Sequence, residues 1–246
     1  MKLDSLELNQ IYCEDCLSFM KKIPSNSIDL VIADPPFGYT IVRNEWDYIL
    51  NRKDYLRFSL QWMQEMVRIM NEKASAYIFS GIEYAAETRL FLTRPKYCNL
   101  KLLNWIIWKF DLGYHPKYHY KMRTNHIFFV SKTDNWIFNA DQVRILVNPK
   151  DKRHNPNGQI PCDVWEFSEP RKNSKEYANH EAQKPLLMIE RMVVASSNRG
   201  DLVFDPFIGS GTTAVVAKKL GRNFLGCDIN QGYIDIANQR LMEIET

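Results

Sequence analysis

The sequence lacks the long apolar runs of a membrane protein and the cysteine pattern of a disulfide-stabilised one. No hydrophobic stretch approaches the ~18 residues that suggest a membrane-spanning helix, and the first residues have neither the basic nor the apolar region of a signal peptide. Five cysteines, an odd number, argue against a disulfide framework. Repeats and low-complexity tracts are also missing. We therefore expect a cytoplasmic protein without membrane contact.

Metal-binding patterns are equally scarce. Cys13 and Cys16 form a lone C-x-x-C pair with no second pair and no histidine pair downstream, so they read better as small apolar residues than as zinc or redox ligands. His115 and His119 are four residues apart, but Pro116 breaks a helix between them and no acidic ligand flanks them. Contact with phosphates or bases suits these histidines better. We expect no metal.

The positive charge of the chain is concentrated in one region. The net charge is only +3, yet eight basic residues between positions 112 and 155 stand against three acidic ones, and four of the five histidines lie there. Such a concentration suggests a polyanionic partner. The candidate contacts with that partner are Lys117, His119, Lys121, Arg123, Lys150, Lys152 and Arg153.

Strands and helices alternate along a chain whose 246 residues suffice for one large α/β domain. Hydrophobic periodicity predicts strands at 28–33, 76–79, 103–108, 126–131, 202–204 and 223–227. It predicts helices at 55–70, 83–92, 186–196, 212–220 and 233–244, with an irregular lobe at 134–179. The alternation indicates a mostly parallel sheet with helices on both faces.

A glycine-rich loop joins a predicted strand to a predicted helix near the C-terminus: Phe204-Asp-Pro-Phe-Ile-Gly-Ser-Gly-Thr-Thr-Ala214. Gly209 and Gly211 permit a tight turn and a close approach of the backbone to a ligand. Asp228 ends the next predicted strand, where it can accept hydrogen bonds from ribose hydroxyls. This βαβ arrangement predicts a nucleoside cofactor at the carboxyl ends of parallel strands.

Three nucleoside cofactors compete for the loop. A nucleoside triphosphate needs Gly-Lys-Ser/Thr, whereas Thr212 and Thr213 follow Gly211 here, so that interpretation fails. The spacing of Gly209, Gly211 and Ala214 does fit a dinucleotide. S-adenosylmethionine carries positive charges in place of a pyrophosphate. Asp205 would suit such a cation and would repel a pyrophosphate.

An aspartate and two prolines directly follow the first long predicted strand. Asp34 directly follows the mostly apolar stretch 28–33, and Pro35, Pro36 and Phe37 come next. In a parallel sheet, a carboxylate at this position faces the ligand crevice. The prolines have no N–H, so their loop is stiff and its carbonyl oxygens accept hydrogen bonds without a competing donor. Asp34 and the Pro35 carbonyl are predicted to form a rigid pair of acceptors beside the Phe37 ring.

Two acceptors beside an aromatic ring suit an exocyclic amine on a planar base. The lone pair of such an amine is delocalised into the ring, so the amine is a poor nucleophile. Hydrogen bonds accepted from both of its hydrogens push the nitrogen toward a tetrahedral geometry, and the freed lone pair can attack a methyl sulfonium. Stacking on Phe37 would hold a base extruded from its helix. Taken alone, the Asp-Pro-Pro sequence also fits a simple turn after a strand.

Together, these motifs resemble the DNA amino-methyltransferases of the β class, which use S-adenosylmethionine. In that class the Asp-Pro-Pro-aromatic motif precedes the glycine loop, as 34–37 precedes 204–211 here. Ile11-Tyr-Cys-Glu-Asp-Cys-Leu17 is similar to the family segment whose acidic residue contacts the cofactor adenine. His180-Glu-Ala-Gln-Lys-Pro185 is similar to the motif whose lysine lies near the methionine carboxylate. The resemblance spans nearly the whole chain.

The resemblance implies specific site residues. The catalytic residues it implies are Asp34, Pro35, Pro36 and Phe37. The cofactor-binding residues it implies are Asp15, Cys16, Asp34, Lys184, Asp205, Phe207, Gly209, Ser210, Gly211, Thr212, Thr213, Asp228, Ile229 and Asn230. Two positions depart from the family pattern, since Phe37 replaces the commoner tyrosine and Glu14 stands where glycine is more usual.

The resemblance also implies one Rossmann-like methyltransferase domain over residues 1–246. Its parts are a catalytic half (about 1–110), a target-recognition region (about 111–179) and a cofactor-loop half (about 180–246). The expected activity is methyl transfer from S-adenosylmethionine to the N6 amine of a flipped adenine in double-stranded DNA, in a bacterial or phage restriction-modification or epigenetic system. A homodimer and a cognate restriction endonuclease are further partners that the resemblance allows.

Other functions also fit the sequence. The first is a cytosine-N4 methyltransferase, although cytosine enzymes more often carry serine before the two prolines. Others are a dinucleotide-binding oxidoreductase and a catalytically silent DNA-binding module. Pro161-Cys162 matches the nucleophile of carbon-5 cytosine methyltransferases, but it lacks their glycine-rich context, and amine methylation needs no covalent intermediate.

Overall fold

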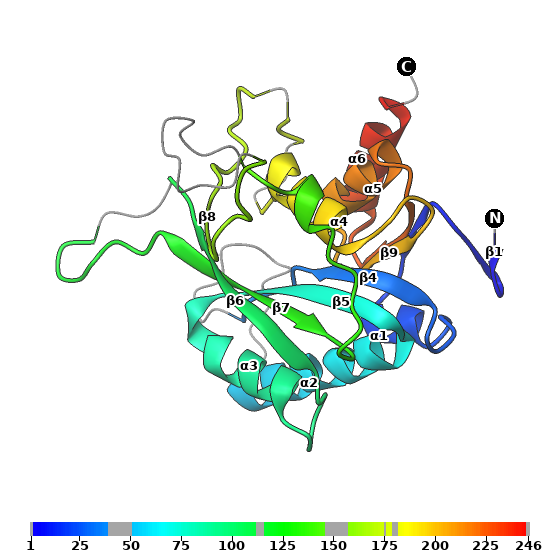
Figure 1. Cartoon of the computed structure of the whole chain (residues 1–246), viewed down its shortest axis with the longest axis horizontal. Coiled ribbons are helices and arrows are strands. Elements are labelled where there is room, and N and C mark those ends of the chain that lie inside the picture. The colour runs from blue at the N-terminus through cyan, green and yellow to red at the C-terminus, as the bar shows by residue number, and fades with distance from the viewer. Residues whose placement is uncertain are drawn as a thin grey trace.

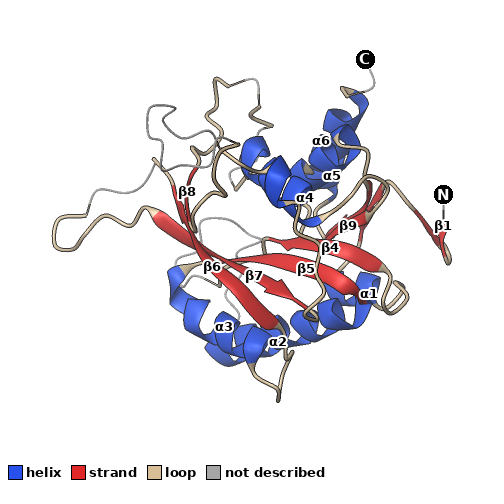
Figure 2. Cartoon of the chain, in the orientation of Figure 1, coloured by secondary structure: helices blue, strands red, loops and turns tan. Residues whose placement is uncertain are grey.

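An eight-stranded sheet runs through the molecule and confirms the predicted α/β fold (Figures 1 and 2). The computed structural model describes residues 2–38, 51–111, 116–145, 157–174, 176–178 and 182–244. The sheet contains β3 (Gln10–Cys13), β4 (Ile28–Ala33), β5 (Met70–Ser80), β6 (Lys101–Lys109), β7 (Thr124–Ser131), β8 (Val164–Glu166), β9 (Leu202–Asp205) and β10 (Asn223–Asp228). A separate two-stranded ribbon joins β1 (Lys2–Leu3) to β2 (Leu6–Glu7).

The strand order is β3-β10-β9-β4-β5-β7-β6-β8, and the sheet is mostly parallel as expected. β7 is antiparallel to its neighbours β5 and β6, whereas every other pair of adjacent strands is parallel. The chain leaves β4 toward β5 on one side and leaves β9 toward β10 on the other. A ligand crevice forms at such a reversal of strand order, outside the carboxyl ends of the strands.

Helices cover both faces of the sheet (Figure 1). One face carries α1 (Cys16–Met20), α2 (Arg52–Ile69) and α3 (Ala85–Thr93), and the other carries α4 (Leu186–Ser196), α5 (Thr212–Lys219) and α6 (Gln231–Met242). Short 3₁₀ turns lie at η2 (Ile82–Tyr84) and η3 (Ala140–Gln142). No helix within the described ranges is long and apolar enough to cross a membrane.

The apolar residues of β4 run without a break from Leu30 to Ala33, where both faces of the strand are buried. Val31 and Ala33 pack in the core under α1 and α2, while Leu30 and Ile32 pack in the core under α4, α5 and α6. Asp29, near the start of the strand, is only half-buried and accepts hydrogen bonds from Asn71 Nδ2 at 2.6 Å and from Leu202 N at 2.7 Å. β4 therefore holds Asp34, the next residue, at a fixed place on the carboxyl edge.

Two expectations about the sheet were wrong. β5 begins at Met70, where α2 ends, and not at position 76, because it pairs along most of its length with β4 or β7. The stretch 134–179 is not wholly irregular, since β8 within it adds an eighth strand beside β6. Three residues are too few to show a period of two, and β8 is fixed by the burial of Trp165.

We predict that replacing Gly211 by alanine destabilises the protein more than replacing Gly200. Both glycines have positive φ, but a Cβ on Gly211 would lie 2.6 Å from the Cβ of Ala237 in α6, whereas a Cβ on Gly200 has no neighbour within 4 Å. Gly200→Ala should cost about 1 kcal/mol of backbone strain, and Gly211→Ala roughly twice that or more. Urea unfolding checks this, and equal losses would contradict the packing of α5 on α6.

Candidate functional site

A pocket lies at the carboxyl edge of the sheet, where β4 and β9 end and α5 begins. Eight predicted site residues line it: Asp34, Lys184, Asp205, Phe207, Gly209, Ser210, Thr212 and Thr213. Six lining residues were not predicted: Ile32, Phe79, Ala182, Gln183, Ile189 and Ile208. The fold thus brings the two motifs that the sequence analysis singled out, about 170 positions apart, into one pocket.

Asp34 and Lys184 form an ion pair inside this pocket. The Lys184 ammonium donates to Oδ2 of Asp34 and to the carbonyl of Ala182 at 3.1 Å. The two side chains are only 20% and 12% exposed. Oδ1 of Asp34 is buried and has no hydrogen-bond partner among the described residues. Burial raises the pKa of Asp34, and the positive charge and hydrogen bond of Lys184 act in the opposite direction.

The partner of Lys184 was not predicted. The resemblance implied that its ammonium lies near the methionine carboxylate of the cofactor, and the structure places it on Asp34. The same ammonium lies 5.3 Å from the ring centroid of Phe79 and 5.9 Å from that of Trp108. These rings and the Asp34 carboxylate together stabilise a cation that is removed from water.

The Asp-Pro-Pro loop is attached to α2. The Tyr55 hydroxyl donates to the carbonyl of Pro36 at 3.1 Å, and a Cβ on Gly38 would lie 2.7 Å from the Tyr55 ring. Phe37 is partly buried and packs against the core under α4, α5 and α6. Pro35, Pro36 and Phe37 do not line the pocket itself. They fix the backbone from which Asp34 projects, and Tyr55 was not predicted to take part.

The glycine loop is organised by two aspartates. Oδ1 of Asp205 accepts from Phe207 N at 3.0 Å, and its Oδ2 accepts from the Thr213 hydroxyl at 2.6 Å. Oδ2 of Asp228 accepts from Gly209 N at 3.1 Å. Asp205 is predicted to suit a cationic cofactor, and in the structure it lines the pocket while each of its oxygens also accepts one hydrogen bond that holds the loop.

Asp34 and Asp205 line the pocket, Asp228 lies next to it and binds the glycine loop, and the charges of Asp34 and Asp228 act on Asp205. Burial, opposed by the hydrogen bonds from Thr213 and Phe207, raises the pKa of Asp205 to about 7, and the charges of Asp34 and Asp228 add to the rise. Burial also raises the pKa of Asp228. A site with this many carboxyl groups stabilises a positively charged ligand and opposes a pyrophosphate.

The remaining predicted cofactor residues flank the pocket beside Asp228. Asp15 caps α1 by accepting from the backbone N–H groups of residues 17 and 18, and Cys16 behind it is buried. Burial, with the charge of Asp15, raises the pKa of Cys16 to about 12. Asn230 caps α6, and Ile229 is exposed. Gly211 forms the left-handed N-cap of α5.

Glu14 connects the segment that contains Asp15 and Cys16 to the end of β10. Its N–H donates to the Asp228 carbonyl at 2.9 Å, and its carboxylate forms an ion pair with Lys22 at 2.6 Å. The sequence motif at 11–17 and the end of β10 are therefore neighbours in the structure. A glycine is not needed at position 14.

The predicted DNA contacts are only partly described. Lys117 and His119 are exposed, and Lys121 is partly exposed. Arg123 instead donates to the carbonyls of Phe110 and Asp111 at 3.0 and 2.8 Å. The other predicted contacts and two residues of a quoted motif lie outside the described ranges: Lys150, Lys152, Arg153, His180 and Glu181.

Gln183 is a functional candidate that the sequence analysis passed over. It is buried, its Oε1 accepts from Ala178 N at 2.7 Å, and its Nε2 donates to the Glu176 carbonyl at 2.6 Å. These bonds hold the segment before Lys184. Its place in the quoted motif at 180–185 was the available signal. Phe79 ends a predicted strand, but nothing in the sequence shows that its ring faces Lys184.

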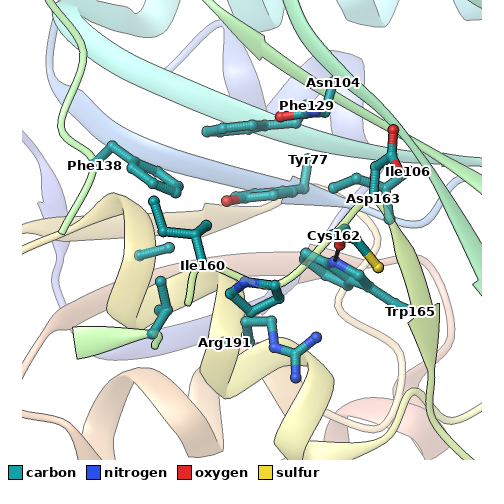
Figure 3. A pocket seen from close by; sticks show the side chains of 13 residues that line it. Tyr77, Asn104, Ile106, Phe129, Phe138, Ile160, Cys162, Asp163, Trp165 and Arg191 are labelled. Atoms are coloured by element: carbon teal, nitrogen blue, oxygen red, sulfur yellow. Dashed lines mark hydrogen bonds between the residues drawn. The ribbon is translucent and has the colours of Figure 1, made fainter. Parts of the chain in front are cut away.

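A second pocket lies under α4, beyond the first one along the sheet (Figure 3). Pro161, Cys162, Tyr77 and Trp165 are among the residues that line it, and Figure 3 shows Trp165 beside Cys162. Cys162 is a free thiol whose sulfur lies 3.4 Å from the Val164 carbonyl. Since neither Asp34 nor the glycine loop lines this pocket, the geometry gives no support to Cys162 as a nucleophile. Among the described residues, no group of three or more His, Cys, Asp or Glu side chains could hold a metal ion.

Comparison with known proteins identifies the family. A family model described as DNA methylase matches residues 28–239, which include both the Asp34 loop and the glycine loop. The chain belongs to the DNA methylase family. This membership confirms the resemblance drawn from the motifs and rules out the dinucleotide-binding oxidoreductase.

Similar methylases cover nearly the whole chain. The type II methyltransferase M1.MboII of Moraxella bovis is 36% identical, over 98% of this chain and 99% of its own length. M.HpaI of Haemophilus parainfluenzae is 35% identical, over 94% and 74%. The DNA adenine methyltransferase YhdJ of Escherichia coli K12 is 35% identical, over 96% and 83%. The chain is therefore a DNA methyltransferase of the restriction-modification type.

Solved methylase structures share the fold. The cytosine-N4-specific PvuII DNA methyltransferase aligns with a TM-score of 0.77 at 20% identity, covering 94% of this chain and 85% of its own. M1.HpyAVI, solved as a complex with S-adenosylmethionine, aligns with a TM-score of 0.68 at 24% identity, covering 94% and 98%. S-adenosylmethionine, the predicted cofactor, is thus bound in a protein of this fold.

We predict that Asp205 makes the stability of this methylase depend on pH. Its folded pKa of about 7 exceeds the ordinary value of 3.8, so the native state binds a proton that the unfolded state releases. Stability should therefore fall as pH rises from about 4 to about 7, by as much as ~4 kcal/mol, and then level off. Asp205→Asn keeps the shape without the charge and should flatten this slope in urea unfolding. An unchanged slope would show that Asp205 ionises normally.

Proposed function

We propose that this DNA methyltransferase transfers a methyl group from S-adenosylmethionine to the N6 amine of an adenine flipped out of double-stranded DNA. The observation that carries the proposal is the free acceptor, Oδ1 of Asp34, which is buried at the pocket shared with the glycine loop. A buried acceptor without a partner is costly, and such groups are retained where a ligand satisfies them.

The residues of this chain fit the cofactor. The carboxyl groups of Asp34, Asp205 and Asp228 make the pocket favourable for a cation. Gly209 and Gly211 bring the backbone of the glycine loop close to a ligand, and a Cβ on Gly211 has no room. When bound, S-adenosylmethionine supplies an electrophilic methyl group on a sulfonium.

We assign the cofactor contacts according to position around the pocket. Phe207, Ser210, Thr212 and Thr213 line it from the loop and the start of α5. Asp228 uses one lone pair of each oxygen for the loop and for Asn230 N, and it keeps others for ribose hydroxyls. Asp15, Cys16, Ile229 and Asn230 would border the adenine ring. Lys184 lines the same pocket, and its ammonium, which donates to Asp34 and to the Ala182 carbonyl, keeps a third hydrogen that would bind the methionine carboxylate.

Asp34 would prepare the amine of the target base. Its free oxygen accepts one amine hydrogen, and the Pro35 carbonyl would accept the other. This removes the amine lone pair from conjugation with the ring. The rigid Pro35-Pro36 backbone and its bond from Tyr55 keep both acceptors in place. Phe37 would stack on the extruded base.

Adenine is favoured over cytosine by the residue before the two prolines. The relative YhdJ, 35% identical, is an adenine methyltransferase by name. Position 34 is aspartate, and cytosine-N4 enzymes of this family more often carry serine there. The PvuII enzyme, which shares the fold, is cytosine-N4-specific by name. Cytosine N4 is the second candidate.

The DNA would meet the region from 111 to 179, and the halves about 1–110 and 180–246 would carry the chemistry. Exposed basic residues such as Lys117 support this division. A homodimer and a cognate restriction endonuclease remain partners that we propose from the family alone.

The direct test is methyl transfer in vitro with an Asp34→Asn variant. Wild-type protein, S-adenosylmethionine and unmethylated DNA should give N6-methyladenine in nucleosides analysed by mass spectrometry. Asp34→Asn should lower kcat/KM by about 100-fold or more, because its amide puts a donor where the amine needs an acceptor. The matched control is Asp4→Asn, which changes an exposed carboxylate in the turn between β1 and β2, outside the region proposed to meet DNA. N4-methylcytosine as the product would select the second candidate.

A second test concerns the pH profile. The positive charge of Lys184 lowers the pKa of Asp34 against the effect of burial, so Lys184→Gln should raise this pKa. Because the reaction needs the carboxylate, the acidic limb of kcat/KM should move to higher pH. Lys101→Gln, the control, breaks the exposed ion pair with Asp134 and should leave the limb in place. An unmoved limb in Lys184→Gln would contradict the role of the pair.

A further inference from the structure

The loop between β6 and β7 carries two tyrosines that the fold leaves in solvent. Tyr118 is 95% exposed and Tyr120 is 99% exposed. Met122, in the same loop, is 47% exposed. In Figure 1 this loop extends away from the body of the molecule before it enters β7. We call residues 116–123 the arm.

The arm leaves the sheet at the same edge as the candidate site. β6 ends at Lys109, and Lys109 pairs with Thr124 at the start of β7. The register places Ala33 beside Ile78 and Ile78 beside Phe128, so that Thr124 lies beyond Asp34 in the direction in which β4 runs. A duplex that presents a base to Asp34 at this edge therefore approaches the side from which the arm projects.

The base of the arm is held firmly. Arg123 donates to the carbonyls of Phe110 and Asp111, and Phe110 N donates back to the Arg123 carbonyl at 3.1 Å. The Asp111 carboxylate accepts from the Ser168 hydroxyl at 2.5 Å. These bonds close the two ends of the loop on each other. The tip is presented from a fixed base, which lowers the entropy cost of binding.

Tyr118 and Tyr120 are almost fully exposed and contribute nothing to the core, so folding does not require tyrosine at these two positions. The tip also carries Lys117 and His119, and the described residues 116–120 contain no acidic side chain. Flat rings among basic residues match a polyanion with planar groups. Nucleic acid has both, since bases stack on aromatic rings and phosphates attract lysine.

We propose that Tyr118 and Tyr120 stack on DNA bases that become unstacked when the target base leaves the helix. This inference rests on the proposed function, because a flipped base leaves neighbouring bases and an orphaned partner exposed. The two rings cover those faces and favour the open state of the duplex. Lys117 holds the phosphates on either side.

The test measures binding of fluorescein-labelled DNA by anisotropy, with an intact duplex and with the same duplex carrying one abasic site. Wild-type protein should prefer the abasic duplex, which is already unstacked. The double variant Tyr118→Ala/Tyr120→Ala should lose this preference. Each stacking ring that is removed should weaken binding of the abasic duplex by a factor between about 5 and about 100. Tyr118→Phe/Tyr120→Phe keeps both rings and should behave as wild type.

Two further variants separate stacking from charge and from general surface effects. Lys117→Ala should reduce the slope of log affinity against log salt by about one unit, and the tyrosine variants should leave that slope unchanged. Met242→Ala alters a side chain that is 68% exposed at the end of α6 and should change nothing.

The outcomes are distinguishable. If wild-type protein methylates DNA but the double alanine variant binds both duplexes as wild type does, the inference fails and the proposed function stands. If the double alanine variant changes the sedimentation of the free protein and not its DNA affinity, the arm is a protein interface and the inference also fails. If wild-type protein neither binds nor methylates DNA, the proposed function itself is wrong.

Discussion

The burial of the Asp34 carboxylate beside Lys184 is the constraint on which the rest of the site depends. Removing either charge from water alone would cost several kcal/mol, so each residue needs the other in place. Asp34 is positioned by β4 and by the prolines behind it, and Lys184 by Gln183 and the start of α4. The pair therefore joins the two halves of the chain at one point. It also satisfies only one carboxylate oxygen, and the other is the acceptor that we propose for the substrate amine.

The carboxyl groups around the pocket have two roles, which are to hold the glycine loop and to favour a cationic ligand. Asp205 holds the glycine loop with both oxygens, and its raised pKa reflects a charge that the apo site tolerates poorly. Asp228 fixes Gly209 from the neighbouring strand and retains free lone pairs. A cationic cofactor relieves this accumulation of negative charge. The same electrostatics explain why a glycine pattern that also fits a dinucleotide serves a methyltransferase here.

The sequence was sufficient for the parts of the structure that follow local rules. The mostly apolar stretch 28–33 predicted β4 with its observed bounds, and 186–196 predicted α4 with its preceding proline. β8 could not be predicted, because three residues show no period and only their pairing with β6 makes them a strand. Which residues come together at the site was predicted from the order of the motifs, because the carboxyl ends of parallel strands lie at one edge of the sheet.

The contacts within the site were harder to predict, because they depend on side-chain directions in three dimensions. The cofactor contacts expected for Asp15 and Asp205 stay predictions, and the structure adds roles that the sequence did not indicate, since Asp15 caps α1 and Asp205 braces the glycine loop. The contact of Lys184 with Asp34 joins residues 150 positions apart, and no spacing rule reports it. The exposure of Tyr118 and Tyr120 likewise could not be predicted, because the basic and aromatic composition of this stretch does not show whether its rings are buried.

The most direct measurement of the central claim is the methylation of a genome that begins without it. The protein is expressed in a bacterial host lacking DNA methylation, and modified bases are mapped by single-molecule sequencing. The account predicts N6-methyladenine in one recurring sequence, and its disappearance when the host carries Asp34→Ala at the same protein level. Unmodified DNA in a host that accumulates the folded wild-type protein, or methylation that persists undiminished with Asp34→Ala, would contradict it.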